Sequence, residues 1–244
     1  MPPGATAGGI AVVIDVLRAS TTMITALARG AGQVLPAADV AEARRRAAEI
    51  GAAAVLGGER GGTRIAGFDL GNSPAEYTAD RVAGRTVVIT TTNGTAALAA
   101  CAAAREVLVG AIVNRAAVAA AARRLAALAD GGAVHLVCAG TDGVVTAEDV
   151  LAAGAILEAA ARPPRAAGDE LDPAARAARA AFRALVAAHP GRLPAALGRE
   201  FSAAPGGTNL VALGMAADIV AAAQLDALDV VPRLDRGSGM LRAT

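Results

Sequence analysis

Hydroxyl, amide and glycine residues follow an apolar run near the middle of the chain, a pattern that could bind an anion. Residues 86–90 are mostly β-branched and apolar, which predicts a buried strand, and the alanine-rich segment 96–104 predicts a helix. The free N–H groups at a helix N-terminus attract negative charge, and glycine lets a ligand approach the backbone. The residues that would form this anion site are Thr91, Thr92, Asn93, Gly94 and Thr95. The alternative is an ordinary helix cap, because Thr and Asn are favoured at that position.

Charged residues occur in the same way at two other predicted strand ends. Asp15 ends an apolar run that begins at Ile10, with Arg18 close behind it, and Glu59 and Arg60 come after another short strand. A carboxylate at a strand end is a structural cap, a ligand for a hard metal ion or a nucleophile. Each arginine offers a planar fork for phosphate, sulfonate or carboxylate, unless it pairs with a nearby acid, as Arg60 could with Glu59.

A fourth predicted strand, 133–138, leads into Gly140 and Asp142, and the helix after it carries Glu148 and Asp149 in its first turn. These carboxylates are candidate metal ligands or bases. The alternative is a favourable interaction with the N-terminus of the helix dipole.

The elements around these clusters alternate between strand and helix for about 160 residues, which predicts an α/β fold. We expect a three-layer α/β/α domain over 1–244 with a mostly parallel or mixed sheet. A helical excursion is predicted over 165–200, a long helix over 209–225, and an edge strand at 230–232 because Pro232 cannot donate to a ladder. Ligands of such folds bind at the carboxyl ends of the strands, so the polar clusters should meet there.

The composition excludes several classes of function. Aromatic residues make up 2% of the chain and the net charge is +1, so nucleic acid is not an expected partner. No run of about 18 strongly apolar residues predicts a membrane span, and the N-terminus lacks the pattern of a signal peptide. The 2 cysteines favour a cytoplasmic protein without disulfides, and the 2 histidines leave carboxylates as the expected metal ligands. The oligomeric state stays open, a homo-oligomer included.

Familiar phosphate motifs are absent. The chain has no G-x-x-x-x-G-K-[ST] motif and no G-x-G-x-x-G after the first strand, so it is neither a P-loop protein nor a dinucleotide-binding protein of the usual kind. Several loops rich in N–H groups, two arginines and a set of carboxylates remain. This inventory favours a small, multiply anionic ligand bound together with Mg²⁺.

Six motifs together resemble the 2-phosphosulfolactate phosphatases. They are Asp15-Val16-Leu17-Arg18-Ala19-Ser20-Thr21-Thr22, Gly58-Glu59-Arg60-Gly61-Gly62, Gly67-Phe68-Asp69-Leu70-Gly71-Asn72-Ser73-Pro74, Thr90-Thr91-Thr92-Asn93-Gly94-Thr95, Cys138-Ala139-Gly140-Thr141 and Glu148-Asp149. The resemblance implies a three-layer α/β fold and a Mg²⁺-dependent phosphatase of coenzyme M biosynthesis that converts 2-phosphosulfolactate into sulfolactate and phosphate.

From the strand ends and this resemblance together we predict three groups of site residues. The catalytic residues are Asp15, Arg18, Glu59 and Arg60. The substrate-binding residues are Ser20, Thr21, Asn72, Ser73, Thr91, Thr92, Asn93, Gly94, Thr95 and Gly140. The Mg²⁺ ligands are Asp15, Glu59, Asp142 and Asp149. Two other functions stay open: a non-catalytic anion-binding protein, and an isomerase or lyase acting on a small acid.

Overall fold

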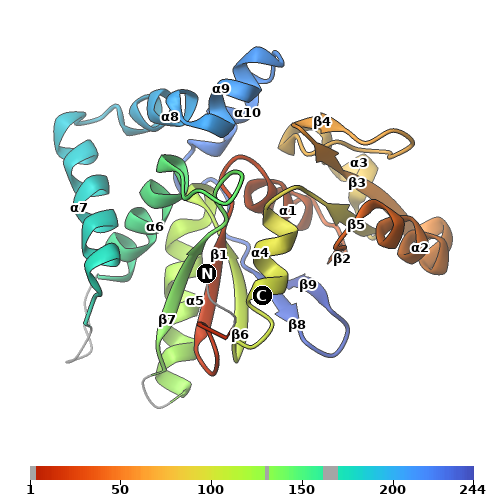
Figure 1. Ribbon diagram of the computed structural model, residues 1–244, viewed down its shortest axis with the longest axis horizontal. Helices are drawn as coiled ribbons and strands as arrows, with labels where there is room; N and C mark the ends of the chain where they lie inside the picture. Colours follow the sequence, from red (N-terminus) through yellow and green to blue (C-terminus); the bar gives the residue numbers. More distant parts are fainter. Residues whose placement is uncertain (1–3, 130–131, 162–169) are drawn as a thin grey trace.

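The computed structural model describes residues 4–129, 132–161 and 170–244 (Figure 1). In this part of the chain nine strands form one sheet, in the order β4-β3-β5-β2-β9-β8-β6-β1-β7. The strands are β1 (Ile10–Ile14), β2 (Gln33–Pro36), β3 (Ala54–Arg60), β4 (Thr63–Arg64), β5 (Thr86–Thr90), β6 (Glu106–Gly110), β7 (Val134–Cys138), β8 (Pro232–Asp235) and β9 (Met240–Ala243). The α-helices are α1 (Ala19–Ala28), α2 (Val40–Ile50), α3 (Ala79–Val82), α4 (Gly94–Ala100), α5 (Arg115–Leu128), α6 (Ala147–Ala160), α7 (Pro173–Ala188), α8 (Leu193–Ala203), α9 (Pro205–Ala212) and α10 (Ala216–Ala222).

The sheet consists of two parallel groups joined by a hairpin from the end of the chain. Strands β3, β5 and β2 are parallel to one another, as are β6, β1 and β7. The hairpin β8–β9 lies between the groups and is antiparallel to both neighbours. The predicted α/β class with a mixed sheet is therefore confirmed.

The prediction of an edge strand at 230–232 is wrong, because β8 lies inside the sheet. Pro232 is tolerated there because it is the first residue of β8, where a missing N–H does least harm to the ladder. Arg233 pairs with Leu108 of β6, and its guanidinium binds both carboxylate oxygens of Glu106 at 2.8 and 2.6 Å. These contacts hold the hairpin between the two groups.

The two parallel groups point in opposite directions across the hairpin, so in a flat sheet their carboxyl ends would lie at opposite edges. Figure 1 shows instead that the groups are strongly rotated relative to each other. Helix α1 packs on the shared inner face and contacts strands from both groups as well as the hairpin. A Cβ atom added to Gly94, after β5, would lie 2.5 Å from the Cβ of Ala19, after β1. The twist thus brings the carboxyl ends of both groups together.

Helices cover both faces of the sheet. Buried residues of α1 and α4 form one apolar core with the inner face of both strand groups. Helices α5, α6, α7, α8 and α10 share a second core with the outer face of β1 and β6, and α2 forms a third with β2 and β5. The predicted helical excursion over 165–200 is confirmed by α7 and α8, while residues 162–169 lie outside the described chain.

The long helix predicted over 209–225 is wrong, because two helices, α9 and α10, occupy this region. Gly214 separates them with a φ of 74°, a left-handed conformation that glycine adopts without a steric penalty. The break turns the start of α10 towards α1. None of the helices in the described part of the chain combines the length and the hydropathy that a membrane span requires.

Candidate active site

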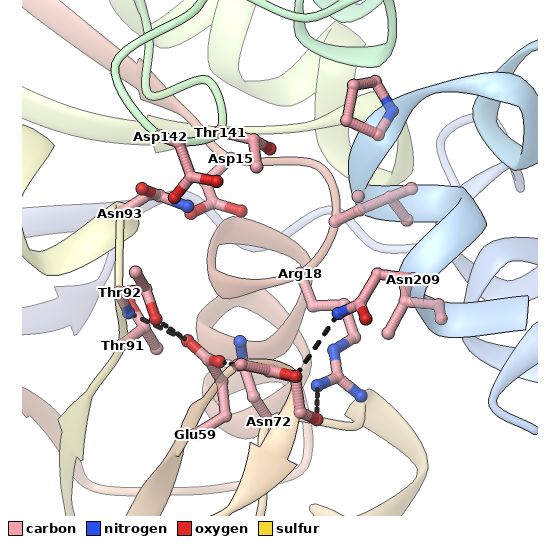
Figure 2. Close-up of a pocket in the computed structure, with 16 residues that line it drawn as sticks. Asp15, Arg18, Glu59, Asn72, Thr91, Thr92, Asn93, Thr141, Asp142 and Asn209 are labelled. Atoms are coloured by element: carbon pink, nitrogen blue, oxygen red, sulfur yellow. Dashed lines mark hydrogen bonds between the residues drawn. The ribbon is translucent and has the colours of Figure 1, made fainter. Parts of the chain in front are cut away.

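One cavity of about 360 Å³ lies where four strand ends meet (Figure 2). Residues at or just beyond the ends of β1, β3, β5 and β7 line it together with helix α9, so the predicted convergence of strand ends is present. The lining residues are Asp15, Leu17, Arg18, Glu59, Gly61, Gly62, Asn72, Thr91, Thr92, Asn93, Thr141, Asp142, Pro205, Gly206, Asn209 and Leu210.

Asp15 leaves β1 directly at the wall of the cavity. Its backbone N–H donates to Ser20 Oγ at 2.9 Å, and its Oδ1 accepts the N–H of Ala19, in the first turn of α1, at 3.1 Å. Only 7% of the residue is exposed. Burial raises the pKa of Asp15 to about 7, and the charges of Glu59 and Glu148 add to the rise. Because Oδ1 is engaged by α1, Oδ2 is the oxygen available to a ligand.

Two further carboxylates are buried behind Asp15. Asp149 accepts the N–H of Val16 and of Gly140, both at 2.9 Å, so it ties the ends of β1 and β7 together. Burial and the charge of Asp15 raise the pKa of Asp149 well above its usual value. Glu148 accepts the hydroxyl of Thr146 at 2.7 Å, but its other oxygen is buried without a hydrogen-bond partner among the described residues. This concentration of buried acids favours a bound cation.

Glu59 joins two loops of the cavity wall. Its Oε1 accepts both the N–H and the hydroxyl of Thr92, at 2.8 and 3.0 Å, and its Oε2 accepts the N–H of Gly62 at 2.8 Å. A carboxylate of the protein itself therefore occupies part of the anion site that the β5–α4 turn was predicted to form. The turn does attract an anion, but Thr92 N–H is already engaged.

Arg18 lies at the opposite end of the cavity (Figure 2) and is 4% exposed. One terminal nitrogen donates to Asp218 Oδ2 at 2.8 Å and to Met215 Sδ at 3.0 Å, and the other donates to the carbonyl of Gly62 at 2.6 Å. Contacts in two directions keep the guanidinium in one orientation. Such a rigid fork suits recognition of an oxyanion.

The chain resembles known proteins over nearly its whole length. The family model described as 2-phosphosulpholactate phosphatase matches residues 2–237. A protein of Symbiobacterium thermophilum named probable 2-phosphosulfolactate phosphatase is 41% identical over 96% of this chain and 95% of its own length. A protein of Deinococcus radiodurans with the same name is 43% identical over 93% of this chain and 88% of its own.

This chain belongs to the 2-phosphosulfolactate phosphatase family. The resemblance predicted from six motifs is therefore confirmed. In this family member, the motif residues divide into those that line the cavity and those that support it.

Half of the predicted site residues line the cavity: Asp15, Arg18, Glu59, Asn72, Thr91, Thr92, Asn93 and Asp142. The others do not line it: Ser20, Thr21, Arg60, Ser73, Gly94, Thr95, Gly140 and Asp149. Several of these support the wall, as when Thr21 Oγ1 donates to the carbonyl of Val16 at 2.8 Å and Thr95 Oγ1 to that of Thr91 at 3.0 Å. Thr21 and Thr95 thus act on the site through the backbone.

Arg60 shows why adjacent charged residues can have different roles. Strand β3 extends through Arg60, so Glu59 and Arg60 lie within a strand and their side chains point to opposite faces. Glu59 faces the cavity, whereas Arg60 is exposed and donates to Thr90 Oγ1 at 3.0 Å and to the carbonyl of Glu59 at 2.7 Å. The structure therefore places Arg18, but not Arg60, on the cavity wall.

Several residues of the cavity were missed by reasoning from the sequence. They are Leu17, Gly61, Gly62, Thr141, Pro205, Gly206, Asn209 and Leu210. Asn209 on α9 donates to the carbonyl of Gly61 at 3.3 Å, which closes the cavity against the β3–β4 turn. The run of small residues at 204–208 was a usable signal, since small side chains permit close approach.

The residues present fit a magnesium ion held by few protein ligands. Among the described residues, no three Asp, Glu, His or Cys side chains are grouped closely enough to hold a metal by themselves. Mg²⁺ usually binds one or two carboxylates and completes its shell with water and phosphate oxygens. Asp15 and Asp142 both line the cavity, and the partnerless oxygen of Glu148 marks uncompensated acid nearby. The larger predicted set with Glu59 and Asp149 stays a prediction.

Replacing Gly94 by alanine should destabilise the protein. The new Cβ would lie 2.5 Å from the Cβ of Ala19 and 2.7 Å from Asp15 Oδ2, so α4 must move away from α1. We expect the free energy of unfolding to fall by about 1–3 kcal/mol, as overpacking usually does. Denaturant titration measures this change.

Gly198 on α8 is the matched control, because a Cβ there meets nothing within 4 Å. Gly198→Ala should leave stability unchanged or raise it by up to about 1 kcal/mol. An unchanged unfolding midpoint for Gly94→Ala would show that the contact between α1 and α4 is loose.

Proposed function

We propose that this protein is a Mg²⁺-dependent phosphatase that hydrolyses 2-phosphosulfolactate to sulfolactate and phosphate. The observation that carries the proposal is one cavity with the buried carboxylate of Asp15 at one end and the tethered Arg18 at the other, in a chain of this family. The two relatives described above have names that specify this substrate. A role in coenzyme M biosynthesis in the cytoplasm is part of the same proposal.

The residues at the Asp15 end would act on the phosphoryl group. Asp15 Oδ2 faces the space beside the β5–α4 turn. It would either attack phosphorus, which breaks the P–O bond to sulfolactate and leaves an acyl phosphate that water then hydrolyses, or take a proton from a water molecule that attacks phosphorus and displaces sulfolactate directly. Thr91 and Asn93 offer polar side chains beside it for the phosphoryl oxygens. Asp15 and Asp142 would hold Mg²⁺, which when bound supplies positive charge that neutralises phosphate oxygens.

The residues at the Arg18 end would bind and orient the rest of the substrate. The guanidinium supplies fixed donors, and Asn209 with the β3–β4 turn closes the cavity over them. A substrate held at both ends loses much of its translational and rotational freedom before reaction, which accelerates the chemical step.

Phosphate release is the test of this function. The protein incubated with 2-phosphosulfolactate and Mg²⁺ should release inorganic phosphate, whereas a non-catalytic anion-binding protein or an isomerase or lyase should release none. Binding of the substrate without any release of phosphate would reject the phosphatase proposal.

Removing divalent metal should stop turnover and lower the thermal stability. Excess chelator should abolish phosphate release, and restored Mg²⁺ should raise the melting temperature, because a cation relieves the repulsion among buried carboxylates. Differential scanning fluorimetry with and without Mg²⁺ measures the second effect independently of activity.

The Asp15→Asn variant is the control for the metal effect, since it removes a proposed ligand. Its melting temperature should respond much less to Mg²⁺ than that of the natural protein. Full phosphatase activity in excess chelator would contradict the metal requirement.

A further inference from the structure

The cavity has two chemically different ends. Figure 2 shows Asp15, Asp142 and Asn93 at one end and Arg18 with Asn209 at the other. If the proposed function holds, the phosphoryl group belongs at the Asp15 end, where the reacting carboxylate lies. 2-Phosphosulfolactate also carries a sulfonate and a carboxylate, and one of these two groups then extends towards Arg18.

Arg18 has donors left for such a group. A guanidinium carries five N–H donors, and three of them have acceptors among the described residues: Asp218, Met215 and the carbonyl of Gly62. Two donors therefore remain. Asn72 lines the same cavity, is 4% exposed, and its Oδ1 is buried without a hydrogen-bond partner in the described chain. An acceptor in this state calls for a donor, such as a water molecule or the hydroxyl of the product sulfolactate, so it marks this part of the cavity as polar without itself binding the acidic group.

Asp218 controls the direction of the arginine. This residue of α10 is 4% exposed, and its two oxygens have separate tasks: Oδ2 accepts from Arg18 at 2.8 Å, and Oδ1 accepts from the hydroxyl of Ser73 at 2.6 Å. The hydroxyl fixes the carboxylate, and the carboxylate fixes the guanidinium. Asp218 does not line the cavity, so it would act only through Arg18.

We propose that Asp218 is a positioning residue that orients Arg18 to bind the non-reacting acidic group of the substrate, a sulfonate or carboxylate. Arg18 would thereby set the preference for phosphomonoesters that carry a second acid. This inference rests on the proposed function and assigns the two ends of the cavity to different groups of the same substrate.

The Asp218→Asn substitution would weaken the contacts of residue 218 with Arg18 and Ser73 while keeping the size of the side chain. Two donors, from Arg18 and Ser73, now each find a carboxylate oxygen, but an amide has one oxygen and one NH₂ group. The amide oxygen can still accept from Arg18 while the NH₂ group donates to the hydroxyl of Ser73, because a hydroxyl accepts as well as donates. What Asp218→Asn removes is the negative charge, so the hydrogen bond that holds the guanidinium becomes about half as strong. The guanidinium is then held less firmly, and binding of the second acid should suffer selectively.

Equilibrium binding of two probes tests the inference without requiring turnover. Sulfolactate carries the non-reacting acidic groups, and inorganic phosphate represents the reacting group. By titration calorimetry, Asp218→Asn should raise the Kd of sulfolactate by about tenfold or more, the effect of losing one well-directed charged contact, and change that of phosphate much less. Ser73→Ala should shift the same ratio in the same direction by about threefold, the effect of one hydrogen bond.

Asp226→Asn is the matched control, because Asp226 pairs with Arg115 at 3.0 Å and does not line the cavity. It should leave both dissociation constants unchanged. If Asp218→Asn does not fold, Ser73→Ala carries the test alone. Equal weakening of both probes, an unchanged Kd for sulfolactate, or no sulfolactate binding by the natural protein would overturn the inference. Selective weakening in a protein that releases no phosphate would support this assignment while rejecting the proposed phosphatase function.

Discussion

Asp15→Asn should reduce phosphate release by about 10²-fold or more, the size of effect seen when a preorganised group at the reacting centre is lost. The substitution keeps the shape of the side chain and an Oδ1 acceptor for the N–H of Ala19, so the start of α1 is retained. It removes the charged oxygen that faces the cavity. Measured kcat and KM for phosphate release give the effect, and circular dichroism confirms that the fold is intact.

The same variant should be at least as stable as the natural protein when metal is absent. Burial raises the pKa of Asp15 to about 7, against an unfolded value near 3.8, so the folded state disfavours the charged form. The contribution of Asp15 to the free energy of unfolding is fully present below about pH 3.8 and is lost as the pH rises through about 7. A neutral amide at this position avoids that loss. At pH 8 in chelator, the melting temperature of Asp15→Asn should therefore equal or exceed that of the natural protein.

Asp80→Asn is the control for this pair of effects, since Asp80 is exposed on α3 and does not line the cavity. It should change neither turnover nor melting temperature. An Asp15→Asn protein that unfolds would assign Asp15 to the structure, and one that turns over normally would remove it from the chemistry.

Arg18→Lys should lower kcat/KM by more than about tenfold, equivalent to about 1.4 kcal/mol of transition-state stabilisation. Lysine keeps the charge but has a single ammonium group. It cannot bind Asp218 and the carbonyl of Gly62 in the planar arrangement of Arg18 and still present a fork to the substrate. Steady-state kinetics with 2-phosphosulfolactate measures the loss.

Arg60→Lys provides the comparison for Arg18→Lys. The sequence predicted a catalytic role for both arginines, because both lie near strand ends. In the structure, however, Arg60 is exposed and does not line the cavity. We now expect Arg60→Lys to change kcat/KM by less than about threefold, in the range of a surface contact. Equal losses in both variants would show that Arg60 reaches the substrate, and no loss in either would make Arg18 a structural residue.

The sequence by itself determined the local elements and the places where they end. Apolar runs such as Ile10–Ile14 and Thr86–Thr90 became fully buried strands, because alternation of strand and helix depends on local patterns of burial. Polar residues directly after these runs, Asp15 and Thr91 among them, reached the cavity because a side chain at the carboxyl end of a strand projects into the crevice. Family membership followed from the same short motifs.

Only the tertiary structure decided how the two halves of the sheet meet. The β8–β9 hairpin lies far along the chain from the strands that it joins, and Asp218 pairs with Arg18 across 200 residues. Local patterns carry no record of such pairings, which depend on the twist of the sheet and on the break at Gly214. The same applies to Gly94, whose importance comes from close packing against α1, and to Arg60, which alternation within β3 turns away from the cavity. Long-range packing therefore selected, from residues that the sequence marked as candidates, those that can touch a ligand.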